Sequence, residues 1–249
     1  MDGKTPFFIF GYPLLNEKTY LCILKSEKTP FRKRRKMKVN KIKTIERTPV
    51  EDRTTKAAPL SKEVQEDLRL ALETLKQGGV ILYPTDTVWG LGCDATDEDA
   101  VKKVYAIKKR EDSKALITLV DSEAKVEFYV RQVPPVAWDV IELNTRPTTI
   151  IYDNARNLAA NLMAEDGSVG IRITKEQFSH ELCQRFRRAI VSTSANISGE
   201  PTPQNFSEIS DEIKNAVDYV VQYRQGDKTK ASPSSIIKMG AKGEVKIIR

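Results

Sequence analysis

The sequence predicts an α/β domain built on an open mixed sheet, and two observations support that fold class. From residue 61 onward, helical apolar stripes alternate with short apolar runs that end in polar loops. Further along the chain the alternation becomes less regular, which favours a mixed sheet flanked by helices over a purely parallel one. The 249 residues are enough for one sizeable domain, and they contain no internal repeat.

The helices are predicted from capping residues and apolar spacing. Ser61 can cap a helix that ends at Gly78-Gly79, and its apolar stripe consists of Val64, Leu68, Ala71, Leu72 and Leu75. A second helix is predicted after Thr96-Asp97-Glu98-Asp99, a capping signal with acidic residues in the first turn.

Strands are predicted where short apolar runs end at turn residues. The first, Val80-Ile81-Leu82-Tyr83, ends at Pro84, and further strands are expected at 115–120, 148–152, 168–173, 189–193, 218–223, 234–238 and 245–249. Gly90-Leu91-Gly92 opens a loose dinucleotide-binding pattern, but the residues from Pro84 to Trp89 separate it from its strand. We therefore expect a turn there.

The basic character of the chain belongs to its first residues. The net charge is +7, yet residues 1–43 hold 12 Lys/Arg and 3 Asp/Glu, which leaves −2 for the remainder. Residues 44–60 are rich in Thr, Pro and charge and show no period. We therefore predict a basic, flexible leader and linker at 1–60 and a single domain at 61–249. The run Arg32-Lys33-Arg34-Arg35-Lys36 suits nucleic acid, although a solvated tail is the preferred interpretation.

Cysteine and histidine usage argues against several kinds of site. The three cysteines form no Cys-x-x-Cys pair and His180 is the only histidine, so we expect neither a disulfide framework nor a protein-built metal site. A phosphate-binding P-loop and a Gly-x-Ser-x-Gly nucleophile elbow are absent from the sequence. No apolar run reaches the length of a membrane span and no targeting segment is evident, which predicts a cytoplasmic protein without membrane contact.

Four polar or cationic segments are candidates for a ligand site. Thr85-Asp86-Thr87 follows a strand, at a position where open α/β sheets bind ligands. Lys108-Lys109-Arg110 closes a helix, and Arg172 ends an apolar strand, where a guanidinium needs an anionic partner. Val191–Thr202 carries hydroxyl, amide or carboxylate side chains at seven of its twelve positions. Taken singly, the first two fit an ordinary turn and helix-dipole partners at least as well.

In this order the segments resemble the threonylcarbamoyl-AMP synthase family, which has a YrdC-like fold. The resemblance runs from about Gly78 to Arg249 and implies a short form without the extra C-terminal domain of longer members. Its motifs are Pro84–Gly92, Lys108-Lys109-Arg110 with Lys114, Ser168–Ile173, Ser192–Asn196 with Ser198-Gly199 and Pro201-Thr202, Ser234–Ile237 and Ile247–Arg249.

The resemblance implies that L-threonine, bicarbonate and ATP become threonylcarbamoyl-AMP and pyrophosphate, for the N6-threonylcarbamoyl modification of adenosine in tRNA. Mg²⁺ is expected to accompany ATP, and tRNA and the tRNA threonylcarbamoyl-transfer proteins are possible partners. Asp86 could orient Mg²⁺ or an amine. By family position, Lys108 and Arg110 are the catalytic cations; Lys109, Ser113, Ser168, Ser194, Asn196, Thr202 and Arg249 contact ATP; Thr85, Thr87, Thr118, Arg172, Ser192 and Ser235 contact threonine, with Arg172 on its carboxylate.

The chain departs from the family pattern at several positions, and other functions stay open. Glu111, Ala115 and Thr174 replace residues common in the family, and Thr145-Arg146 stands where Pro-Gly is usual. One alternative is a non-catalytic RNA-binding protein of the same fold, which the net charge of −2 outside the leader disfavours. Another is the carbamoyl transfer performed by related domains in hydrogenase maturation.

Overall fold

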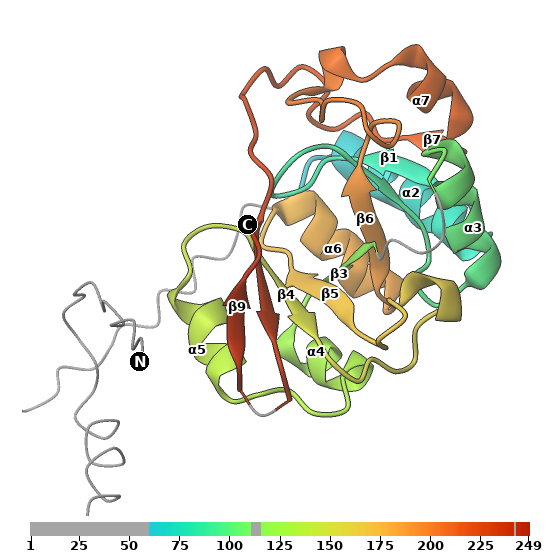
Figure 1. Cartoon of the computed structure of the whole chain (residues 1–249). Coiled ribbons are helices and arrows are strands. Elements are labelled where there is room, and N and C mark those ends of the chain that lie inside the picture. Colours follow the sequence, from blue (N-terminus) through green and yellow to red (C-terminus); the bar gives the residue numbers. More distant parts are fainter. Residues whose placement is uncertain (1–59, 111–115, 242) are drawn as a thin grey trace, which may run out of the picture. The chain divides into compact units, whose positions relative to one another are not determined.

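The computed structural model describes residues 60–110, 116–241 and 243–249 (Figure 1). Nearly all of the predicted leader and linker, together with Ser113 and Lys114, lie outside the described residues, so the domain boundary at residue 61 stays a prediction. The helices are α2 (Lys62–Lys76), α3 (Glu98–Ile107), α4 (Glu123–Tyr129), α5 (Val136–Leu143), α6 (Gln177–Phe186) and α7 (Asp211–Ala216), with 3-10 turns η1 (Ala160–Leu162) and η2 (Phe206–Glu208).

The predicted capping and apolar spacing of the first helix are confirmed. The Ser61 hydroxyl accepts a hydrogen bond from the Val64 amide at the start of α2. Leu68, Ala71 and Leu75 are fully buried, because their spacing puts them on the face that packs toward the sheet. Gly78 follows the helix with a φ of 71°, a left-handed conformation that glycine adopts without strain.

The strands form one open mixed sheet, as the sequence predicts. They are β1 (Ile81–Tyr83), β2 (Gly90–Gly92), β3 (Ile117–Val120), β4 (Thr148–Tyr152), β5 (Val169–Ile173), β6 (Ile190–Ser194), β7 (Tyr219–Val220), β8 (Ser235–Met239) and β9 (Val245–Ile247). Among the described residues the order is β7-β1-β2-β6-β3-β5-β4-β8-β9, with β1–β7, β3–β5 and β4–β8 parallel. Figure 1 shows α2, α3 and α7 at the β7–β1 end and α4 and α5 at the β4–β9 end.

The expected turn at Gly90–Gly92 is wrong, because these residues form β2, between β1 and β6 and antiparallel to both. A Cβ atom added to Gly92 would lie 2.6 Å from Tyr83 Cε1 and 3.0 Å from the Val191 carbonyl oxygen. The missing side chain therefore lets β2 fit between its neighbours. This close packing is a tertiary requirement that the Gly-x-Gly spacing alone does not reveal.

A buried carboxylate ties α2 to the segment after β7. Asp67 accepts hydrogen bonds from the Tyr219 hydroxyl at 2.6 Å and from the backbone amides of Gln222 and Tyr223. The carboxylate is buried, and these donors satisfy its hydrogen-bonding capacity. The contact fixes the start of the chain segment that later reaches the ligand cavity at Ser234.

Candidate active site

A cavity of about 310 Å³ lies against one face of the central strands. Four strands contribute to its floor: Ile117 belongs to β3, Arg172 to β5 and Ile236 to β8, and the consecutive residues Ser192–Ser194 form the end of β6. The complete lining is Thr87, Val88, Gly90, Arg110, Leu116, Ile117, Arg172, Ser192, Thr193, Ser194, Thr202, Pro233, Ser234, Ile236 and Arg249.

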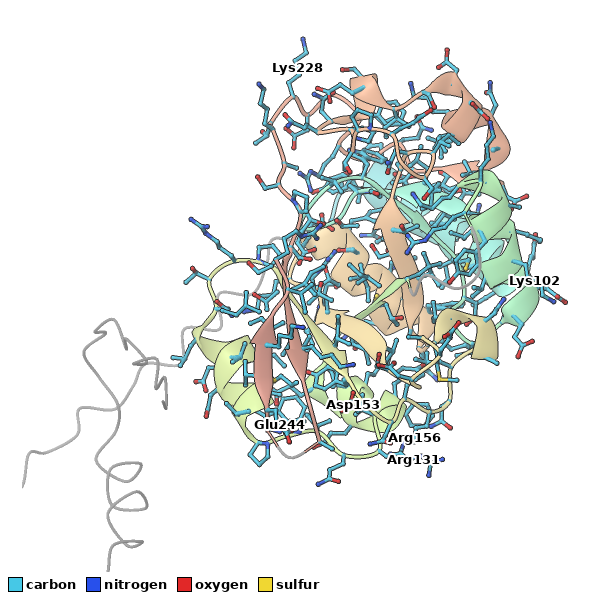
Figure 2. All side chains as sticks on the ribbon, in the orientation of Figure 1. Lys102, Arg131, Asp153, Arg156, Lys228 and Glu244 are labelled. Atoms are coloured by element: carbon cyan, nitrogen blue, oxygen red, sulfur yellow. The ribbon has the colours of Figure 1, made fainter. Side chains whose placement is uncertain are left out.

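The segment between β7 and β8 closes one side of this cavity. Lys228 of that segment projects outward from the protein (Figure 2), whereas Pro233 and Ser234 line the cavity. Arg249 reaches the same wall from the last strand, and its Nε donates to the Ser234 carbonyl oxygen at 3.2 Å. Residues far apart in the sequence therefore meet at one site.

Three guanidinium groups line the cavity, and no carboxylate is among its described lining residues. Arg110, Arg172 and Arg249 supply the positive charge. Burial lowers the pKa of Arg110 from its ordinary value, as expected for a cation partly withdrawn from water. Hydroxyl groups of Thr87, Ser192, Ser194, Thr202 and Ser234 stand beside these cations. The arrangement suits a polar ligand with several negative charges.

Lys108 lies beneath the cavity wall. Its Nζ donates hydrogen bonds to the carbonyl oxygens of Ser194 at 2.5 Å and Asn196 at 2.7 Å, and its side chain is buried. Burial, with a smaller contribution from Arg110, lowers its pKa to about 8. In this structure Lys108 therefore holds the loop after β6, and its implied contact with triphosphate stays a prediction.

Asn196 and Lys109 also lie away from the cavity lining. The Asn196 side-chain amide donates to the carbonyl oxygens of Ile197 and Glu200, which holds the loop that carries Thr202. Lys109, with a φ of 48°, points outward and pairs with Glu212 at 2.8 Å, and both side chains are more than half exposed. The adjacent cations Lys108, Lys109 and Arg110 thus have three different surroundings.

The loop Thr85-Asp86-Thr87 surrounds Arg172. Arg172 Nη2 lies 3.0 Å from Asp86 Oδ1 and donates to the Thr87 hydroxyl at 3.3 Å. Thr85 is buried and holds the loop, because its Oγ1 accepts from the Thr87 amide and donates to the Val88 carbonyl oxygen. Thr87 lines the cavity, whereas Thr85 acts through the loop conformation.

The structure places three other implied ligand contacts outside the lining. Ser235 lies one residue beyond the position that faces the cavity, so Ser234 lines it and hydrogen-bonds to the Thr149 hydroxyl at 2.8 Å. Thr118 alternates with Ile117 and points to the opposite face, where its buried hydroxyl has no hydrogen-bond partner among the described residues. Ser168 precedes β5, about 13 Å along the strand from Arg172.

A second cavity of about 300 Å³ adjoins the first across the Asp86–Arg172 ion pair. Ile141, Asn144, Thr145, Arg146, Pro147, Thr148, Ile173, Lys175 and Glu176 line it together with Asp86. The departures from the family pattern at Thr145 and Arg146 therefore lie here and not in the first cavity. Sequence reasoning did not predict this second cavity.

The described residues contain neither a cluster of potential metal ligands nor a membrane-spanning helix. Within them, no group of three or more His, Cys, Asp or Glu side chains is arranged to hold a metal ion. No helix in the described part of the chain is long and apolar enough to span a bilayer.

The comparisons with known proteins agree with this architecture. The threonylcarbamoyl-AMP synthase of Pseudoalteromonas translucida is 33% identical over 171 residues, covering 68% of this chain and 91% of its own. The Coxiella burnetii protein of the same name is 31% identical over 164 residues, covering 66% and 88%.

Solved structures show the same fold. The Pyrococcus abyssi Sua5 structure "complexed with L-threonine" superposes with a TM-score of 0.67 at 22% identity, covering 77% of this chain and 55% of that one. Escherichia coli YciO gives a TM-score of 0.65 at 23% identity, covering 74% and 89%. The family model described as "Telomere recombination" matches residues 73–249, and the chain belongs to the Sua5/YciO/YrdC family.

Proposed function

We propose that this protein is a nucleotidyltransferase that forms threonylcarbamoyl-AMP and pyrophosphate from L-threonine, bicarbonate and ATP. The observation that carries the proposal is the cavity in which three guanidinium groups stand beside a row of neutral hydroxyls. Relatives that are at least 30% identical over two thirds of the chain and are named threonylcarbamoyl-AMP synthase support the same reaction.

The phosphates of ATP are assigned to Arg110 and Arg249. Both guanidinium groups are held at the lining, and Ser194 and Thr202 add hydroxyl donors. In the reaction, a carbamate oxygen attacks the α-phosphorus and pyrophosphate leaves, so negative charge grows on the phosphoryl oxygens. Fixed cations in a partly desolvated cavity stabilise that charge without having to reorganise. The reaction needs no covalent enzyme intermediate, which fits the absence of a nucleophile elbow from the sequence.

The amino acid is assigned to Arg172. Its guanidinium can bind the threonine carboxylate, and the hydroxyls of Thr87, Ser192 and Ser234 can pair with the substrate hydroxyl. The superposable Sua5 structure is complexed with L-threonine, which supports an amino-acid site in this fold. The threonine amine first reacts with bicarbonate to form carbamate and water, and close positioning of the reactants supplies much of the rate.

Mg²⁺ and the partners downstream form part of the proposal. Mg²⁺ would enter with ATP and be held mainly by phosphate oxygens and water, since no Asp or Glu is among the described residues that line the first cavity. The product would pass to the proteins that transfer the threonylcarbamoyl group to tRNA, and the cytoplasm is the proposed location.

The decisive experiment is pyrophosphate release and adenylate formation from ATP, bicarbonate and labelled threonine. Threonine should react fastest, serine more slowly because it lacks the methyl contact, and valine hardly at all. A pocket that pairs a substrate hydroxyl is left with unpaired polar groups when that hydroxyl is missing. Turnover of valine at the threonine rate would contradict the assigned pocket, and failure to form any adenylate would contradict the function.

A further inference from the structure

A long coil between β7 and β8 forms one rim of the first cavity (Figure 1). We call its residues 228–233 the strap. Five of these six residues are exposed to solvent, yet the last of them, Pro233, also lines the cavity. The strap contains neither helix nor strand, so no regular ladder of hydrogen bonds holds it in place. It therefore separates the cavity from solvent with little structure of its own.

Both ends of the strap are anchored to the domain. Just before it, Arg224 has a left-handed φ of 64°, pairs with Asp227 at 2.9 Å and donates to the Thr85 carbonyl oxygen at 3.3 Å. Just after it, the buried Ser234 side chain hydrogen-bonds to the Thr149 hydroxyl at 2.8 Å. These contacts fix two points about which the strap can turn.

The middle of the strap is held weakly. Among the described residues, 230–233 make one hydrogen bond, from the Ala231 amide to the Gln204 carbonyl oxygen at a rather long 3.3 Å. Thr229 and Ala231 line a void of about 10 Å³ beside Thr87. Segments with few buried contacts and an exposed backbone are those that open locally at a low cost in free energy.

The Ala231–Gln204 hydrogen bond bridges the rim of the cavity. Gln204 lies two residues after Thr202, and Thr202 and Pro233 both line the cavity. The cavity volume of about 310 Å³ is at the lower end of the ~300–1,000 Å³ of cavities that hold one drug-sized ligand. The proposed function, on which this inference rests, requires ATP, threonine and bicarbonate to be bound together. The three substrates therefore need a wider cavity than the one that the bridged rim encloses.

We propose that the strap is a lid, which swings away from Gln204 to admit the substrates and closes over them before the chemical steps. Opening breaks the Ala231–Gln204 hydrogen bond, while the contacts of Arg224 and Ser234 hold the two ends. Closure has a chemical reason, because the product is a mixed anhydride of a carbamate and a phosphate, which water would hydrolyse. A closed lid excludes water until the product leaves.

The first test locks the lid with a disulfide. The Ala231 nitrogen and the Gln204 carbonyl oxygen lie 3.3 Å apart, which brings the two residues close enough for a disulfide in the double variant Gln204→Cys/Ala231→Cys. Oxidation of the full chain with diamide should abolish threonine-dependent pyrophosphate release, and reduction should restore it. The reduced variant should keep wild-type turnover, since neither side chain lines the first cavity. Diamide-treated wild type is the control for the native residues Cys22, Cys93 and Cys183.

The second test follows the lid in the wild type by limited trypsin cleavage after Lys228 and Lys230. Both lysines are exposed, and Lys228 projects outward from the protein (Figure 2). Cleavage should become slower when threonine, bicarbonate and α,β-methylene-ATP, which cannot release pyrophosphate, close the lid. Cleavage after Arg131, which lines neither cavity, is the internal control and should keep its rate.

Full turnover by the completely cross-linked protein would overturn the proposal, and so would strap cleavage at one rate with and without the substrates. If the disulfide does not form or the variant does not fold, the tryptic measurement on the wild type decides. Adenylate formation by the reduced variant, with undiminished activity after cross-linking, would contradict only the lid. Absence of adenylate from the wild type would instead contradict the proposed function.

Discussion

Replacing Lys108 with Met should damage activity far more than stability. Met fills the space of the lysine stem but cannot donate to the carbonyl oxygens of Ser194 and Asn196, which Lys108 holds at 2.5 and 2.7 Å. Those carbonyls belong to the loop that places Ser194 and Thr202 in the cavity lining. Without the ammonium, the loop loses the contact that fixes it.

The stability change follows from two opposing contributions. Two hydrogen bonds from a charged donor are worth about 3–6 kcal/mol together. The mutation also removes the cost of burying this cation. Its pKa falls from 10.5 to about 8 on folding, which corresponds to a stabilisation of the variant by about 3 kcal/mol. The free energy of unfolding should therefore decrease by only about 0–3 kcal/mol. The turnover of Lys108→Met should fall on the order of 100-fold, the loss expected when a catalytic group is misplaced by about 1 Å.

The assays are urea unfolding and threonine-dependent pyrophosphate release at saturating substrates. Lys102→Met is the matched control, because that lysine forms an exposed ion pair with Asp99, and such pairs contribute about 1 kcal/mol or less. A folded Lys108→Met variant with wild-type turnover would refute the reasoning. So would equal losses of activity in Lys108→Met and Lys102→Met.

Three further predictions follow from named contacts. Arg110→Ala should lose about 2–4 kcal/mol of transition-state stabilisation, measured as kcat/KM for pyrophosphate release, and unchanged kinetics would remove Arg110 from the mechanism. Asp67→Ala should lower the free energy of unfolding by about 2–4 kcal/mol, because three donors lose their acceptor; a loss below about 0.5 kcal/mol in urea unfolding would contradict this. The pKa of Lys108 is about 8 in the folded protein and lies below its unfolded value of 10.5, so the unfolded chain binds more protons between about pH 8 and 10.5. The free energy of unfolding of the wild type, relative to that of Lys108→Met, should therefore rise with pH across that window. A difference between the two proteins that does not change with pH would contradict this.

Some features of the fold were predictable because they depend on local patterns. The apolar stripe of α2 and the Ser61 cap are properties of one segment, and the structure confirms them. The mixed sheet also followed from the irregular alternation of strands and helices. The strand β2 was missed because it depends on the absence of a side chain at Gly92, next to Tyr83 and Val191, and both neighbours are distant in the sequence.

The sequence by itself determined the fold class, the family resemblance and most of the polar residues that surround the cavity. Only the tertiary structure decided which of them face it. The strand register puts Ser234 and Ile117, and not Ser235 and Thr118, in the cavity lining, because a shift of one residue turns a side chain to the other face of a sheet. Lys108 is buried away from the cavity lining, whereas Arg110 lines the cavity, although both belong to one motif. The partnership of Asp86 with Arg172 joins residues 86 positions apart, and no local pattern encodes a contact made by the packing of separate strands.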